Sequence, residues 1–291
     1  MYGFIEEHGE YAVAKWAGYF GVSTSGYYAW RNREEEAEDK KKTRCEEIKR
    51  IFEESGGTYG PERIAGVLRR NGEKASRPTV ERYMAEMGLS SIHNRHRTRS
   101  LTDSRKARGE GYENLMRDTQ VEEPYTAVCS DITYLKTGEG FEYLCVVKDI
   151  MSGEVLSEAT GSRMTKELVI RAFLGAQARH GLRAGTIFHS DRGSQYASKA
   201  FRELLEQYGI KQSFSRVGMP GDNAWAESFF ATLKKECIRW RRFETRDEVR
   251  QAVFAYIEGF YNTKRVQKRL GYLSPRQYVK SLYQGSRQLV A

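Results

Sequence analysis

Three acidic residues stand in three unlike sequence settings, and together they could carry metal-dependent chemistry. Asp131 lies in CSDITYL, Asp191 in HSDRGSQY and Glu227 in GDNAWAESFFATLKKE, with 35 residues between the last two. The first run is typical of a strand, the second Asp follows a strand-like run, and the Glu lies in a helix-like run. Carboxylates that converge from such elements would bind divalent cations for phosphodiester chemistry, and we expect two Mg²⁺ (or Mn²⁺) ions.

Each of these carboxylates also has an ordinary explanation. Asp131 could form a salt bridge with one of the many Arg or Lys residues, since a charge in mid-strand is costly to bury unpaired. Asp191 could form the turn before Arg-Gly, and Glu227 could interact with the dipole of its helix. Taken singly, these explanations are the better ones. The three carboxylates together favour a catalytic site that binds metal.

The helix-like run around Glu227 carries two further candidates. Lys234 follows Glu227 by seven residues, nearly two helical turns, so both would project from one face and the lysine could meet a phosphate. The alternative is a surface lysine, because Lys235 is adjacent. Asn223 precedes Glu227 by one turn and shares that face, so we expect it to contact DNA as well.

The residues around Asp191 form a second group. Gln195 and Tyr196 lie just beyond it and could contact a substrate strand. His189 lies two residues before it, and we expect this ring to be packed or hydrogen-bonded beside the site and not to bind metal.

The charge balance favours a polyanionic partner. Lys and Arg number 48 against 39 Asp and Glu, which gives a net charge of +9 and a pI of about 9.3. Nucleic acid is the commonest such partner, although many basic proteins bind none. The candidate phosphate contacts lie in two basic segments and are Arg95, Arg97, Arg99, Lys264, Arg265, Lys268 and Arg269.

Length and composition limit the class of protein. A chain of 291 residues allows roughly two domains of about 100–200 residues. The four cysteines have no CxxC spacing, so we expect reduced structural thiols. No signal peptide or apolar run of about 18 residues is visible. We therefore expect a cytoplasmic protein with no membrane partner.

The order of predicted elements indicates the fold. Residues 46–90 show three short helices, of which two are joined by a glycine-containing turn. From residue 124 the pattern predicts three strands, a helix to Gly181, a short strand, a helix, a strand and a long helix from Asp222 to about Trp240. This βββαβαβα order predicts an α/β, RNase H-like catalytic core, a mixed five-stranded sheet with helices, preceded by a small all-α helix-turn-helix-like domain.

Five regions follow from these patterns. They are an N-terminal helical segment (1–42), the helix-turn-helix-like domain (43–92), a basic linker (93–123), the RNase H-like core (124–240) and a C-terminal helical extension of the core (241–291).

Nearly the whole chain resembles the second-frame (OrfB) proteins of the IS-three family of bacterial insertion-sequence transposases. The resemblance is carried by GVSTSGYYAWR, by GTYGPERIAGVLRRNGEKASRPTVERYMAEMGL, by SDITYL, HSDRGSQY and the GDNAWAESFFATLKKE helix, and by YNTKRVQKRLGYLSP. It implies a retroviral-integrase-type (DDE) core with a metal-binding triad at Asp131, Asp191 and Glu227 and a helix cation at Lys234. The 35-residue gap is the family's own. The resemblance also implies a bacterial, nucleoid-associated protein.

Two positions depart from the family pattern. Val128 stands where the family often has Trp, which should alter packing and leave the chemistry intact. Gln267 stands where the family often has His, which puts in doubt a catalytic or metal role for that position, while Tyr261, Asn262 and Arg265 match the motif.

The resulting hypothesis is a transposase that cleaves 3′ ends and transfers strands of an insertion sequence. The alternatives are an RNase H-like nuclease without strand transfer, a catalytically silent DNA-binding regulator and a protein-interaction module. The expected partners are double-stranded DNA at the element ends and the target, further copies of the chain on that DNA, and an upstream-frame OrfA protein or fusion.

Overall fold

A computed structural model describes residues 1–94, 113–117, 119–216 and 220–288. The candidate DNA contacts Arg95, Arg97 and Arg99 lie outside the described residues. No helix among the described residues is long and apolar enough to cross a membrane.

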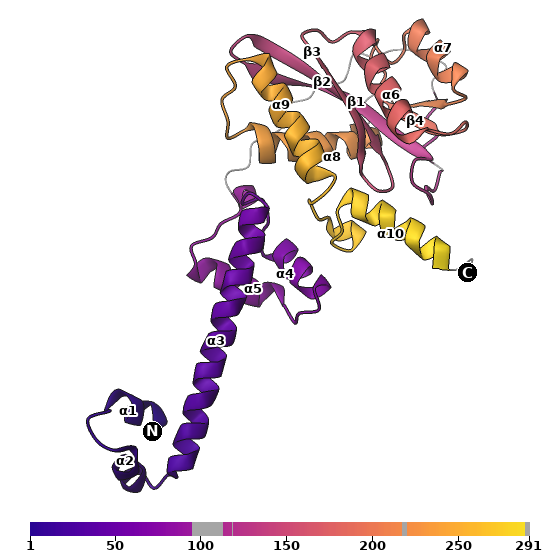
Figure 1. Ribbon diagram of the computed structural model, residues 1–291. Helices are drawn as coiled ribbons and strands as arrows, with labels where there is room; N and C mark the ends of the chain where they lie inside the picture. The colour runs from indigo at the N-terminus through magenta and orange to yellow at the C-terminus, as the bar shows by residue number, and fades with distance from the viewer. Residues whose placement is uncertain (95–112, 118, 217–219, 289–291) are drawn as a thin grey trace.

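The N-terminal third is entirely helical (Figure 1). Its elements are α1 (Tyr2–Glu7), α2 (Val13–Phe20), α3 (Thr24–Glu54), α4 (Pro61–Arg70), α5 (Arg77–Glu86) and the 3₁₀ turn η1 (Ile92–Asn94). Ser23 begins α3 by accepting a hydrogen bond from the Gly26 amide, and Ser76 caps α5 in the same way through Thr79. Pro61 occupies the first turn of α4, where its missing N–H costs nothing.

The charged run after residue 30 is part of one long helix and not a break between helices. Ion pairs between residues four apart, such as Arg31–Glu35 and Arg50–Glu54, line its solvated surface. The short helix predicted around Ile48 is therefore the end of α3, and the predicted boundary at residues 42/43 falls inside this helix. The second half of α3 packs with α4 and α5, through the apolar side chains of Ile48 and Ile51 and an ion pair between Lys41 and Glu86.

The second part of the chain is a mixed sheet covered by helices on both faces. The strands are β1 (Ala127–Thr137), β2 (Gly140–Asp149), β3 (Val155–Gly161), β4 (Ile187–Ser190) and β5 (Lys211–Phe214), in the order β3-β2-β1-β4-β5. The first three strands are antiparallel, and β4 and β5 continue the sheet parallel to β1. This sheet and the preceding helical domain confirm the predicted fold class.

Two apolar clusters hold the helices onto the sheet. The helices are α6 (Lys166–His180), α7 (Lys199–Gln207), α8 (Ala224–Leu233), α9 (Arg246–Tyr256) and α10 (Pro275–Gln288), with short turns η2 (Pro220–Asn223), η3 (Lys234–Ile238), η4 (Ile257–Tyr261) and η5 (Lys268–Leu270). One cluster packs Phe173 of α6 and Phe201 of α7 against Val147. The other packs Phe229 of α8 and Val253 of α9 against Val146. Neighbouring β2 residues therefore face opposite layers, as strand geometry requires.

The helix that begins near residue 222 is not uniform. It starts as the 3₁₀ turn η2, continues as α8, and widens at Lys234 into the π-helical segment η3. The predicted single α-helix from Asp222 to Trp240 is thus three segments. The widened segment turns Glu236 into the protein, where its fully buried carboxylate accepts two bonds from Arg265 and further bonds from His93 and Tyr256.

The segment 260–277 joins the helical domain to the core, and we call it the clasp. Val266 of the clasp is buried in the apolar cluster of α3, α4 and α5. The Tyr59 hydroxyl donates to the Lys264 carbonyl at 3.0 Å and accepts from the Val266 amide at 2.8 Å. Tyr272 lies against Gly66 of α4, and its hydroxyl donates to Glu62. The two parts of the chain therefore share buried contacts and are not joined by the linker alone.

Gly66→Ala tests the packing of the Tyr272 ring against α4. A Cβ at this position would fall inside the tyrosine ring, so the ring must move and lose its bond to Glu62. We expect a loss of about 1–3 kcal/mol in the free energy of unfolding, measured by urea titration. The control is Gly259→Ala, because no atom lies within 4 Å of a Cβ there. Equal stabilities of the two variants would contradict this packing.

Glu236→Gln tests the buried ionic cluster. Burial alone raises the pKa of Glu236, but the bonds from Arg265, His93 and Tyr256 outweigh it and hold the pKa to about 2. Because this lies below the ordinary value of 4.5, the carboxylate stabilises the fold fully above about pH 4.5, and the effect disappears as the pH falls toward about 2. At pH 7 it amounts to about 3 kcal/mol.

The variant should therefore be destabilised at pH 7 and approach the wild type below pH 4, as judged by denaturant midpoints across this range. Glu53→Gln, at an exposed ion pair on α3, is the control and should change the midpoint little at any pH. A pH-independent difference for Glu236→Gln would contradict the assigned role.

Candidate active site

Strand register places Asp131 beside Asp191. The parallel pairs between β1 and β4 run from Ala127↔Ile187 to Cys129↔His189, and β4 ends at Ser190. Continuing the same register by two residues brings position 191 opposite position 131, and adjacent strands lie about 4.8 Å apart. Asp191 therefore follows the carboxyl end of a parallel strand, where polar site residues gather in α/β sheets.

Helix α8 adds Glu227 from the layer above β1. Asp131 pairs with Val146 across the antiparallel ladder, so the two side chains share one face of the sheet. Val146 packs with Phe229, Phe230 and Leu233 of α8 in one apolar cluster. The helix therefore covers the face from which Asp131 projects, and the charge of Glu227 acts on Asp131.

The electrostatics reflect this crowding of negative charge. Burial, then Asp191, then Glu227 raise the pKa of Asp131 to about 7, against a hydrogen bond from the Ile132 amide and the smaller effect of the Lys234 charge. Asp191 lies at the surface, yet protein packed around its carboxyl group still raises its pKa, against a bond from the Gly193 amide. Burial also raises the pKa of Glu227.

None of the three carboxylates forms an ion pair with a Lys or Arg among the described residues. Among the described residues, Asp131 therefore does not form the salt bridge with Arg or Lys that would explain its charge without a metal. Asp191 does shape its turn, since its Oδ1 accepts from the Gly193 amide at 3.0 Å. That role leaves its other oxygen outside the turn.

The oxygen donors suit a divalent cation, but they are not drawn together as a finished site. Within the described ranges, no group of three His, Cys, Asp or Glu side chains is already arranged to hold a metal ion. Like charges repel, which opposes a close approach of the three carboxylates. The chemistry of the donors fits hard cations such as Mg²⁺, which prefer carboxylate oxygens.

Lys234 and Asn223 both lie close to these carboxylates. The Lys234 ammonium is 5.1 Å from the centroid of the Tyr134 ring, and burial lowers its pKa although Asp131 opposes this. The Asn223 side chain is buried and donates from Nδ2 to the Ser130 carbonyl at 3.1 Å. Its Oδ1 is buried without a hydrogen-bond partner in the structure as described.

The residues near Asp191 divide into one reachable and two buried side chains. Gln195 is half-buried and donates to the Met164 carbonyl at 3.2 Å. Tyr196, expected to contact substrate, is 1% exposed, and its hydroxyl lies 2.8 Å from the Ser130 Oγ, so it cannot reach a bound strand. His189 is buried with both ring nitrogens bonded, to Ser213 and Ser215, which agrees with a packed ring.

The C-terminal basic residues do not form one surface. Arg265 is buried against Glu236, so its guanidinium is turned away from solvent and from any phosphate. Lys264, Lys268 and Arg269 are exposed. Lys268 lies 3.3 Å from Glu62, and Arg269 donates to the Met151 carbonyl at 2.6 Å. The sequence alone could not show that Arg265 forms a buried ion pair with Glu236.

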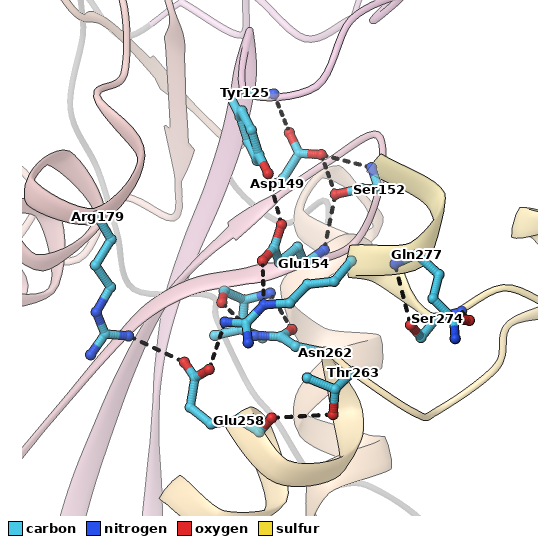
Figure 2. Close-up of polar contacts among 12 residues, drawn as sticks. Tyr125, Asp149, Ser152, Glu154, Arg179, Glu258, Asn262, Thr263, Ser274 and Gln277 are labelled. Carbon is cyan, nitrogen blue, oxygen red and sulfur yellow. Dashed lines mark hydrogen bonds and ion pairs between the residues drawn. The ribbon is translucent and has the colours of Figure 1, made fainter. Parts of the chain in front are cut away.

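The remaining motif residues near Arg265 also support structure. Asn262 accepts from the Val155 amide at 2.9 Å and donates to its carbonyl at 2.8 Å, as a neighbouring strand would. Figure 2 shows this pair beside Glu154, which accepts from Tyr125 and from Arg276 of α10. The network fixes the β2–β3 turn to the C-terminal segment.

One residue near the site was missed in the sequence. Lys148 of β2 is buried, and its Nζ donates to the Trp225 carbonyl of α8 at 2.8 Å. The available signal was a lysine inside the buried run LCVVKDI.

Family profiles match both parts of the chain. Residues 121–220 and 227–282 match family profiles described as "Integrase core domain", and residues 37–97 match "HTH-like domain". Among solved structures, the HTLV-2 integrase catalytic core in complex with magnesium aligns with 54% of this chain and 97% of its own, at 22% identity and a TM-score of 0.41.

Three relatives align with most of the chain. The transposase of insertion sequence element IS904 from Lactococcus lactis is 39% identical over 236 residues, which cover 81% of this chain and 92% of that protein. The 31 kDa protein of insertion element IS600 from Shigella sonnei is 38% identical, covering 91% and 97%. Transposase InsF of insertion sequence IS3A from Escherichia coli is 34% identical, covering 95% and 97%.

Asp131→Asn should stabilise the protein in EDTA. The substitution keeps the shape of the side chain and removes the charge on which Asp191 and Glu227 act. We expect a gain of about 0.5–2 kcal/mol in the free energy of unfolding at pH 8, read from denaturant titrations. The control is Asp247→Asn, whose side chain is 75% exposed. If Asp131→Asn instead lowered the free energy of unfolding, the charged carboxylate would be stabilising the fold, which would contradict this prediction.

Proposed function

We propose, from the fact that this chain belongs to the IS-three (IS3) family of insertion-sequence transposases, that it cleaves DNA at the ends of an element and joins the new 3′ ends to a target. The family and its integrase core make the chain an enzyme of the polynucleotidyl transferase class, with DNA as its partner. The cleavage and joining steps and the residues that perform them are the proposal.

The observation that carries the proposal is that three neighbouring carboxylates in a basic protein form no ion pair with any lysine or arginine that the structure describes. With a net charge of +9, cations are plentiful, yet Asp131, Asp191 and Glu227 form no ion pair among the described residues. Raised pKa values at all three show that negative charge there is costly. Such a cost is retained where function needs unpaired oxygen ligands.

In this proposal the three carboxylates offer oxygen atoms to two divalent cations. When bound, such ions activate a nucleophile and stabilise the leaving oxygen of a phosphodiester. Asp131 and Asp191 supply adjacent ligands from β1 and from the end of β4. Glu227 supplies a third from the exposed first turn of α8.

Neighbouring polar side chains would orient the DNA strand. Lys234, half-buried beside the carboxylates, would place a positive charge against a phosphate oxygen. The half-buried Gln195 amide would donate to the same strand. Asn223, whose Oδ1 is buried, would act indirectly by holding the Ser130 carbonyl next to Asp131. Exposed Lys264, Lys268 and Arg269 would contact phosphates farther from the site.

The same carboxylates can serve both steps because only the nucleophile differs. In the first, a water oxygen attacks phosphorus and the bond to the 3′ oxygen breaks, which leaves a 3′-hydroxyl. In the second, that hydroxyl attacks a target phosphodiester, and one such bond forms as another breaks. The second step needs no external energy source, because the number of phosphodiester bonds is unchanged.

The assembly is also part of the proposal. We infer that several copies act together on paired element ends, and that an upstream-frame protein or fusion contributes to end recognition. The helix-turn-helix-like helices α4 and α5 would bind DNA next to the core.

Strand transfer with pre-cleaved donor DNA tests the function. Asp131→Asn, Asp191→Asn and Glu227→Gln should each lower the joining rate by about 10³-fold or more with Mg²⁺, measured as labelled joined products on a gel. Asp247→Asn, an exposed carboxylate of α9, should match the wild type. Cleavage without joined products would indicate a nuclease. Activity that survived in all three variants would exclude the proposed site.

A further inference from the structure

We propose that Lys148 is a positioning residue that fixes the first turn of α8 and thereby sets Glu227 over Asp131. The inference rests on the proposed function, since it assigns a role in bringing those carboxylates together. Its basis is the contact between the Lys148 ammonium and the backbone of α8, two residues before Glu227.

Lys148 reaches α8 from the face of the sheet that carries Asp131. It pairs with Cys129 and follows Val146 by two residues, so its side chain shares the face of Val146 and Asp131. Only 4% of the residue is exposed, and its Nζ donates to the Trp225 carbonyl at 2.8 Å. In the described part of the chain, no carboxylate lies within ion-pair distance of this ammonium.

The start of α8 depends on such outside contacts. Its N-cap residue, Asn223, makes no side-chain bond to the helix and instead donates to the Ser130 carbonyl of β1. An N-cap of this type usually accepts from the first amides of its own helix. The Trp225 ring meets the buried His189 ring of β4 edge to face, with centroids 6.2 Å apart.

Three strands thus hold one helical turn. From β1, the Ser130 carbonyl next to Asp131 accepts the bond from Asn223. From β4, His189 contacts the Trp225 ring two residues before Asp191. From β2, the Lys148 ammonium donates to the Trp225 carbonyl. Glu227 is therefore located by contacts that begin beside the other two carboxylates. Its own side chain makes no hydrogen bond among the described residues that could locate it.

Stability alone does not explain a lysine at this place. Removing an ammonium from water is costly, and a carbonyl offsets this cost only in part. A methionine of similar length would fill the same space between β2 and α8 without a charge to desolvate. A charged donor to a backbone carbonyl, however, forms a stronger and more directional bond than a neutral one.

Lys148→Met and Lys148→Arg separate positioning from packing. The first removes the donor and the second keeps one. Lys136→Met is the matched control, because Lys136 is an exposed lysine on the neighbouring strand β1. Hydrogen exchange of the α8 amides is measured in the metal-free, DNA-free protein, and strand-transfer turnover and DNA affinity are measured separately.

Lys148→Met should exchange the α8 amides at least about 10-fold faster while those of α6 stay unchanged. Its turnover should fall by about 10-fold or more with DNA affinity unchanged, and Lys148→Arg should restore most of it. Turnover and α8 exchange equal to those of Lys136→Met would overturn the role. Faster exchange throughout the protein would also overturn it, because that result indicates lost global stability.

The proposed function can fail separately. If the wild type and Lys136→Met join no DNA, the function is lost, and the exchange of α8 still decides whether Lys148 holds this helix. If both are active and Lys148→Met matches them, the function stands and the positioning role is lost.

Discussion

The position of Asp131 in the middle of β1 is the constraint on which the site depends. β1 is the central strand, so both of its edges are occupied and both faces are covered. The backbone of Asp131 is held in place by strands on both sides. The residues next to its carboxylate are therefore set by the register with β4 and by the packing of α8. Parallel pairing with β4 supplies Asp191, and the packing of α8 supplies Glu227. The fold therefore brings three negatively charged side chains close together, and their mutual repulsion is a cost that all three positions share.

The charges of two fully buried carboxylates, Glu236 and Asp149, are accommodated in other ways. Glu236 receives Arg265, His93 and Tyr256, and its pKa falls to about 2. Asp149 is also buried, and its oxygens accept from the amides of Tyr125 and Ser152. The chain thus has ample means to satisfy a buried carboxylate. Asp131 accepts from the Ile132 amide but forms no ion pair with an arginine or lysine among the described residues, which distinguishes it from the structural carboxylate of Glu236.

Local sequence pattern predicted the fold well and the partners of individual side chains poorly. Strand alternation and glycine stops gave the order of elements. The position of Asp131 inside a strand and that of Asp191 just after one followed from the same patterns. Contacts that depend on distant residues could not be read locally. Arg265 looked like a phosphate ligand because Glu236, 29 residues earlier, gave no sign of turning inward at a π-helical segment. Tyr196 lies between two half-buried residues in the sequence, yet it is buried itself and its hydroxyl is bonded to Ser130 of β1.

The clasp adds a constraint on how DNA can reach the site. Its buried members join the α3–α5 cluster to the core, through Val266 in the apolar interior and Arg265 in the ionic one. Residues so used cannot also bind phosphate, so the exposed lysines and arginine between them must provide any DNA contact from this segment. Because those side chains alternate with buried ones, DNA lying along the clasp would touch both the helix-turn-helix-like domain and the core. The clasp would then fix the distance and orientation between the DNA-binding helices α4 and α5 and the carboxylate of Asp131, through contacts within a single chain.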